Sequence, residues 1–169
     1  MQIIKCTAKL RKEMGLKNSS LTEVFPAAGL LGAWHANLIY VNRKKCVLFV
    51  NDKTLYNFVV INLSRAKIKE LDSIFIQYLF LNLFQEGFSE ALVKQLTQEY
   101  DTIQFTKTDS KSVLGSMNDL AFHYKYHLEA EGENALPSII HKMNRMPMGA
   151  QNYNYSIESL MKHIEKEVG

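Results

Sequence analysis

Three side chains with metal-binding chemistry recur at intervals of four residues in the second half of the chain. Asp119, His123 and His127 would lie on one face of a helix, because residues four apart are neighbours on a helical surface. A carboxylate and two imidazoles can hold a divalent metal and activate water for hydrolysis of a phosphoester. The segment lacks the H-E-x-x-H pattern, and a second segment would have to complete the coordination shell. The alternative is a solvated helix face, so a divalent metal is a hypothesis and no cofactor is predicted.

Basic side chains form two groups in the first half of the chain, one in a predicted strand and the short helix that follows it, and one in a predicted hairpin turn. Their members are Lys5, Lys9, Arg11 and Lys12 in the first group, and Arg43, Lys44 and Lys45 in the second. Residues 1–70 carry 12 Lys and Arg against 4 Asp and Glu, although the net charge of the whole chain is only +3. Such side chains can contact phosphates, and Trp34 or Tyr40 could stack on a base. The alternative is a solvated helix and a charged turn.

A third candidate is a polar pocket formed by Trp34, Asn37, Lys107, Ser116 and Asn118. Lys107 ends a predicted strand, and Ser116 and Asn118 fall within the first two turns of the helix that follows. Ligands tend to bind where strands end and helices begin. Trp34 and Asn37 belong to a strand that could pair nearby. The alternative is that the two asparagines satisfy buried backbone groups and hold the fold together.

The elements that position these residues are predicted from periodicity and from capping residues. Residues 34–61 alternate strand-like runs with polar breaks, which is typical of an antiparallel meander, and most of the later chain has helical periodicity. Predicted strands cover residues 2–6, 34–41, 46–50, 55–61 and 102–108. Predicted helices cover residues 8–14, 64–86, 89–100 and 110–130, with two more before 146 and after 156. Suitable helix caps are Thr7, Ser64, Ser89 and either Ser110 or Ser112. We therefore predict an α+β fold with an antiparallel sheet of about five strands and helices packed mainly on one face.

Length and composition predict one globular domain over residues 1–169, because 47% of the residues are hydrophobic and 22% are charged. Cys6 and Cys46 lie in apolar runs, which favours free thiols in a reducing compartment over a disulfide between neighbouring strands. The most apolar window, residues 74–84, is too short to cross a bilayer, and no signal peptide is recognisable. We therefore expect a cytoplasmic protein without membrane association.

Several short strings resemble one family of bacterial proteins. They include the patterns W-x-A-N-L at residues 34–38, K-x-x-L-F-V-N at residues 45–51 and V-L-G-S-M-N-D at residues 113–119. They resemble a bacterial domain-of-unknown-function family that has no established activity. The resemblance implies a single-domain bacterial protein and transfers no catalytic residue.

These patterns favour a non-catalytic binding module for a protein or nucleic-acid partner, and the alternative is a metal-dependent hydrolase that acts on a phosphoester. No G-x-S-x-G nucleophile motif is present, since Ser116 lies in L-G-S-M-N. The sequence does not decide whether the protein is an enzyme, which ligand or partner it binds, or whether it forms a homo-oligomer. It also does not show whether the basic residues share one surface.

Overall fold

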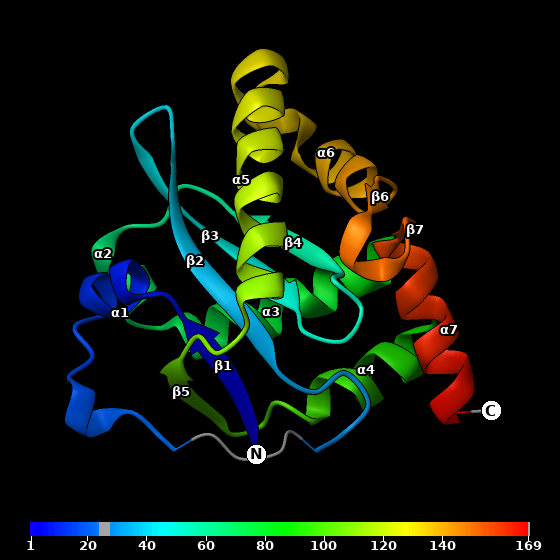
Figure 1. The fold of residues 1–169 in the computed structure, drawn as a ribbon, viewed down its shortest axis with the longest axis horizontal. Helices are drawn as coiled ribbons and strands as arrows, with labels where there is room; N and C mark the ends of the chain where they lie inside the picture. Colours follow the sequence, from blue (N-terminus) through cyan, green and yellow to red (C-terminus); the bar gives the residue numbers. More distant parts are fainter. Residues whose placement is uncertain (24–27, 169) are drawn as a thin grey trace.

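The computed structural model describes residues 1–23 and 28–168, and its elements are shown in Figure 1. The strands are β1 (Gln2–Cys6), β2 (Trp34–Val41), β3 (Lys44–Asn51), β4 (Asn57–Val60), β5 (Ile103–Lys107), β6 (Pro147–Met148) and β7 (Asn154–Tyr155). The α-helices are α1 (Ala8–Met14), α2 (Arg65–Ile68), α3 (Leu71–Gln85), α4 (Glu90–Gln98), α5 (Lys111–Glu131), α6 (Leu136–Met143) and α7 (Ser156–Val168). Short 3₁₀ helices cover Asn18–Ser20, Glu133–Ala135 and Gly149–Gln151.

Within the described residues, five strands form one sheet in the order β4-β3-β2-β1-β5. The β2–β3–β4 meander is antiparallel, as its polar breaks predict. The prediction of a wholly antiparallel sheet is wrong, because β1 pairs in parallel with both β2 and β5. Parallel neighbours need long crossover connections, and the chain supplies these through α1 and through the segment from α2 to α4. The fold is therefore α+β with a mixed sheet.

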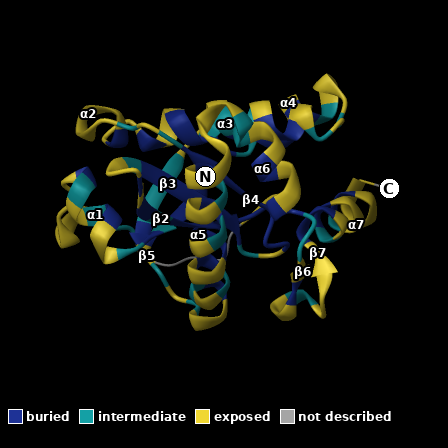
Figure 2. Ribbon diagram, turned by 90° about the horizontal axis from the view of Figure 1, so that it is seen from above, coloured by how far each residue is buried: buried dark blue, intermediate teal, exposed yellow. Residues whose placement is uncertain are grey.

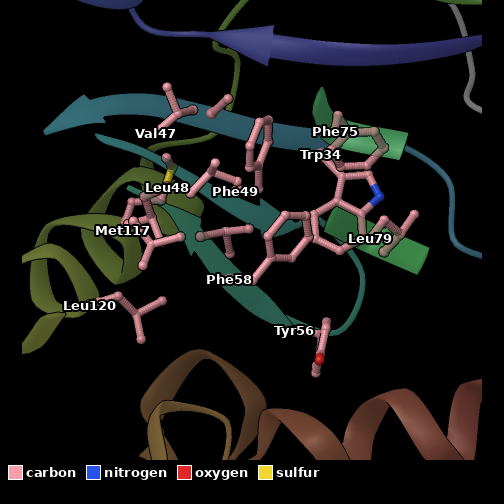
Figure 3. Close-up of a cluster of buried hydrophobic side chains, with 14 of the residues drawn as sticks. Trp34, Val47, Leu48, Phe49, Tyr56, Phe58, Phe75, Leu79, Met117 and Leu120 are labelled. Carbon is pink, nitrogen blue, oxygen red and sulfur yellow. The ribbon is translucent and has the colours of Figure 1, made fainter. Parts of the chain in front are cut away.

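Helices cover both faces of this sheet. The sequence predicted helices mainly on one face, and α5 is the helix that departs from this prediction. In Figure 2 the strands lie between α3 and α4 on one side and α5 on the other. Neighbouring residues of β3 show the same division in Figure 3, where Phe49 lies towards Phe75 of α3 and Leu48 lies towards Met117 of α5. β4 and most of β3 are therefore buried on both faces, which explains their long apolar runs.

An aromatic cluster forms the core between the sheet and α3. The ring centroids of Trp34 and Phe75 are 5.2 Å apart, and those of Phe49 and Phe58 are also 5.2 Å apart. Such edge and tilted contacts add to the free energy gained from burying the rings. The predicted helix over residues 64–86 is divided, because Glu70 has a ψ of 33°, and α2 ends before it.

The state of the two cysteines agrees with the sequence analysis. Cys6 and Cys46 are buried free thiols, and burial raises the pKa of Cys6 to about 12. In residues 1–23 and 28–168, no helix has the length and apolar character needed to cross a membrane.

Candidate functional site

Three segments that are far apart in the sequence form one basic surface. They are α1, the turn between β2 and β3 at residues 42–45, and the segment at residues 64–69 that contains α2. α1 packs against both α2 and β2, and the Leu63 amide donates to the Lys45 carbonyl at 2.9 Å. Both ribbon views place α1 and α2 at the same end of the molecule. We refer to this region as the basic surface.

The basic surface has nine Lys and Arg residues and one acidic residue, Glu13. The nine are Lys9, Arg11, Lys12, Arg43, Lys44, Lys45, Arg65, Lys67 and Lys69. The first six were singled out in the sequence analysis, and the contact between Lys45 and Glu13 shows that their two segments are neighbours. The seventh residue of that set, Lys5, is not part of this surface, because its ammonium contacts Asp52 and Asp109. The last three were missed, because they resemble the ordinary solvated start of a long helix. Only the packing of α1 against α2 reveals that they add to the same surface.

Some of these cations are engaged within the protein. The Lys45 ammonium lies 2.5 Å from Glu13 Oε1, and this hydrogen bond lowers the pKa of the Glu13 carboxyl. The Lys44 ammonium lies 3.1 Å from Glu133 Oε1, and the Arg11 guanidinium donates a hydrogen bond to the Cys6 carbonyl oxygen at 2.6 Å. Exposed members without an ion pair among the described residues are Lys9, Lys12, Arg43, Arg65 and Lys69. These five are available to an external anion.

The β2–β3 turn shapes an open groove beside these charges. Val41 pairs with Lys44, and the two residues between them have positive φ angles, 50° for Asn42 and 64° for Arg43. Two successive positive φ angles match the twist of a two-residue hairpin turn, although Arg is seldom found in this conformation. Arg43, Lys44 and Lys45 line a groove of about 430 Å³ with residues 62–64.

Only one of the two predicted stacking aromatics is accessible at this surface. Tyr40 is 44% exposed and is the cross-strand partner of Lys45. Trp34 is fully buried, and its indole Nε1–H donates to the Tyr100 hydroxyl at 2.8 Å. Trp34 therefore belongs to the core and cannot stack on a base in this structure.

A second group of charged residues lies beside the amino-terminal end of α5, where β1 and β5 end. The group consists of Lys5, His35, Asp52 and Asp109, and we call it the charged cluster. Lys5 on β1 is the direct neighbour of His35 on β2, so their side chains share one face of the sheet. Asp52 follows β3, where its amide donates to the Ala33 carbonyl at 3.1 Å. Asp109 lies between β5 and α5.

Short ionic contacts connect the four side chains. Asp52 Oδ1 is 2.7 Å from His35 Nδ1, and Asp52 Oδ2 is 2.8 Å from Lys5 Nζ. Lys5 Nζ is also 3.0 Å from Asp109 Oδ1. Burial alone would raise the pKa of Asp52, but the hydrogen bonds and charges of His35 and Lys5 outweigh burial and lower it. Burial likewise opposes the charged form of Lys5, and its hydrogen bonds with both carboxylates leave the pKa of Lys5 raised.

Sequence reasoning missed the charged cluster, because its members are isolated residues without a shared spacing. The separations in sequence from Lys5 to His35, Asp52 and Asp109 depend on strand pairing and not on helical or strand periodicity. A weak signal was available in His35, a titratable residue inside the apolar strand β2. A buried imidazole must find partners, so its presence predicts a polar neighbour without identifying it.

The five residues of the predicted pocket do not converge. Trp34 and Asn37 are three positions apart in β2 and therefore face opposite sides of the sheet. Asn37 accepts a hydrogen bond from the Thr7 hydroxyl at 2.8 Å. Lys107 and Asn118 are exposed, and Ser116 is half-buried. The set does not line a common cavity among the described residues.

The residues of the predicted metal site lie on one face of α5, but their side chains do not come together as ligands of one ion. Asp119 and His123 line a groove of about 240 Å³ with Ser116 and residues 146–150. His127 is directed to Glu131, whose carboxylate lies 2.9 Å from Nδ1. Within the described part of the chain, the one group of three residues with metal-ligating atoms within 4.8 Å of one another is His35, Asp52 and Asp109.

Comparison with known proteins places the chain in a family without assigning an activity. A search of curated proteins finds no match. A family model described as a domain of unknown function, DUF6933, matches residues 3–159, which include the basic surface and the charged cluster. Because this match covers most of the 169 residues, the chain belongs to the DUF6933 family.

Proposed function

We propose that the protein is a nucleic-acid-binding module that contacts phosphates through its basic surface. The observation that carries this proposal is the assembly of three separate segments, with nine basic residues and one acidic residue, on one side of the fold. The acidic side chains that pair with Lys44, Lys45 and Lys67 leave an excess of positive charge, which attracts a polyanion and speeds its encounter with the surface. Long Lys and Arg side chains on two helices and a turn can follow a phosphate backbone without reading its sequence.

The groove at the β2–β3 turn gives the surface a second means of contact. Tyr40 lies next to Lys45 in the same hairpin, and Arg43 is one of the residues that line the groove. An exposed aromatic ring beside cations is the arrangement that stacks unpaired bases while the charges hold the backbone. Single strands should therefore gain more from Tyr40 than duplexes do, because duplex bases are already stacked on one another.

The test is fluorescence anisotropy with labelled single-stranded RNA, single-stranded DNA and duplex DNA, at salt concentrations from about 50 to 200 mM. Five unpaired cations predict that the logarithm of affinity falls against the logarithm of salt with a slope of roughly −4 to −5 on duplex DNA. The double variant Lys12→Gln/Arg43→Gln should reduce the magnitude of this slope by about two. A matched control is Lys125→Gln/Lys162→Gln, which removes two exposed cations of α5 and α7.

Two results would oppose the proposal. If no oligonucleotide binds at the lowest salt concentration, the basic surface does not bind nucleic acid, and an acidic protein becomes the expected partner. If both double variants weaken binding equally, the attraction comes from net charge and not from this surface. Tyr40→Ala should weaken single-strand binding more than duplex binding, whereas Tyr126→Ala, which removes a tyrosine that is 62% exposed on α5, should change neither.

A further inference from the structure

One ring nitrogen of His35 has a hydrogen-bond partner, and the other has none among the described residues. The Asp52 carboxylate lies 2.7 Å from Nδ1, and a carboxylate can only accept, so Nδ1 carries the proton of this hydrogen bond. Nε2 is then the nitrogen with a free lone pair in the neutral ring. It has no hydrogen-bond partner among the described residues, and the side chain of His35 is 0% exposed. A buried lone pair of this kind requires a donor or a cation.

Asp109 is placed opposite this lone pair at a separation too long for a hydrogen bond. Its Oδ1 is 3.6 Å from His35 Nε2. An ion at about 2.1 Å from each atom would bridge this separation with an angle of roughly 120°, close to the tetrahedral value. The distance therefore suits two ligands of one metal ion better than it suits a direct contact.

The charge of the cluster also favours a cation. Two carboxylates and one ammonium leave a single negative charge when His35 is neutral. Lys5 does not hydrogen-bond with His35 Nε2; its ammonium contacts the two carboxylates at 2.8 and 3.0 Å. A carboxylate has about four lone-pair directions, so Asp109 can keep its contact with Lys5 and still bind an ion.

We propose that the charged cluster is a divalent-metal site, in which His35 Nε2 and Asp109 are the ligands and Asp52 is the carboxylate that orients the imidazole. Metal-ligating histidines commonly donate their other ring N–H to a carboxylate in this way. An imidazole and a carboxylate suit zinc and neighbouring first-row ions. The Asp109 side chain is 37% exposed, so solvent reaches this carboxylate. This inference is independent of nucleic-acid binding by the basic surface.

The proposal is tested by titrating the chelator-treated full chain, purified without a histidine tag, with zinc and cobalt(II). Calorimetry should give one ion per chain, and cobalt(II) should develop visible absorption typical of low coordination. Asp109→Asn should weaken binding by tenfold or more, and Asp52→Asn, which removes the orienting carboxylate, by about 10- to 100-fold. His123→Gln/His127→Gln is the matched control, because it removes the two imidazoles of α5 that could bind metal adventitiously, and it should leave the affinity unchanged.

The proposal is overturned if neither ion binds, or if binding is lost in the α5 double variant and retained in Asp109→Asn. Circular dichroism and thermal melting establish that each variant is folded. A measurement on the unmodified chain tests the proposal without relying on the folding of any variant. In ¹⁵N NMR of the histidine rings, zinc should shift Nε2 of His35 strongly, and shifts confined to the other histidines would refute the site.

Discussion

The side chain of Asn144 should be one of the strongest single determinants of stability in this fold. It makes four buried hydrogen bonds, of which three join the end of α6 to β4 and the fourth is to Ile140 within α6. Its Oδ1 accepts from the Asn57 backbone N–H at 2.9 Å and from the Asn57 side chain at 3.1 Å. Its Nδ2 donates to the carbonyls of Asn57 and Ile140 at 2.8 and 2.9 Å. Both asparagines are 0% exposed, so water cannot replace these bonds.

Replacing Asn144 with alanine leaves the backbone N–H and C=O of Asn57 without these partners. Each orphaned buried group costs about 1–3 kcal/mol, so we expect Asn144→Ala to lower the free energy of unfolding by about 3 kcal/mol. In a chain of this size each kcal/mol shifts Tm by about 2–4 °C, which predicts a loss of roughly 6–12 °C.

The assay is thermal and urea unfolding followed by circular dichroism, with Asn118→Ala as the matched control. Asn118 is exposed on α5, and the same substitution there should change the free energy of unfolding by about 0.5 kcal/mol at most. The comparison also tests which asparagines hold the fold together. Equal midpoints for the two variants would show that the bonds of Asn144 do not stabilise the native state, and the reasoning from buried partners would fail.

Further predictions concern other buried polar groups. Tyr100→Phe should lower the free energy of unfolding by about 2–4 kcal/mol in urea titrations, because the Tyr100 hydroxyl accepts from Trp34 at 2.8 Å and donates to Gly32 at 2.6 Å. Folding lowers the pKa of Asp52, so its contribution to stability should be present at neutral pH and be lost as pH falls below its usual value of about 4. Asp52→Asn should make the free energy of unfolding less dependent on pH in this acid range. An unchanged dependence would contradict the lowered pKa of Asp52. Cys6, with its pKa raised to about 12, should react with a thiol reagent only after unfolding.

Sequence by itself determined the features whose signals are local. The β2–β3–β4 meander follows from apolar runs separated by polar breaks, and the structure places its strands where those runs occur. The predicted helix caps are confirmed, since the side chains of Thr7, Ser64, Ser89 and Ser110 each accept from the amide three residues later. These features depend on residues within a few positions of one another, so spacing is enough to find them.

Tertiary structure alone decided the parallel position of β1 and the sites that depend on it. Gln2 pairs with Ile103 and Lys5 with His35, and no local pattern specifies a pairing across such separations. The same register brings Lys5 and His35 together with Asp52 and Asp109, and the packing of α1 on α2 completes the basic surface. Alternation along a strand predicts which face of the sheet each side chain occupies. It does not predict which strand lies beside it. Strand order is set by burial of the whole core, and it therefore emerges only when the entire chain has folded.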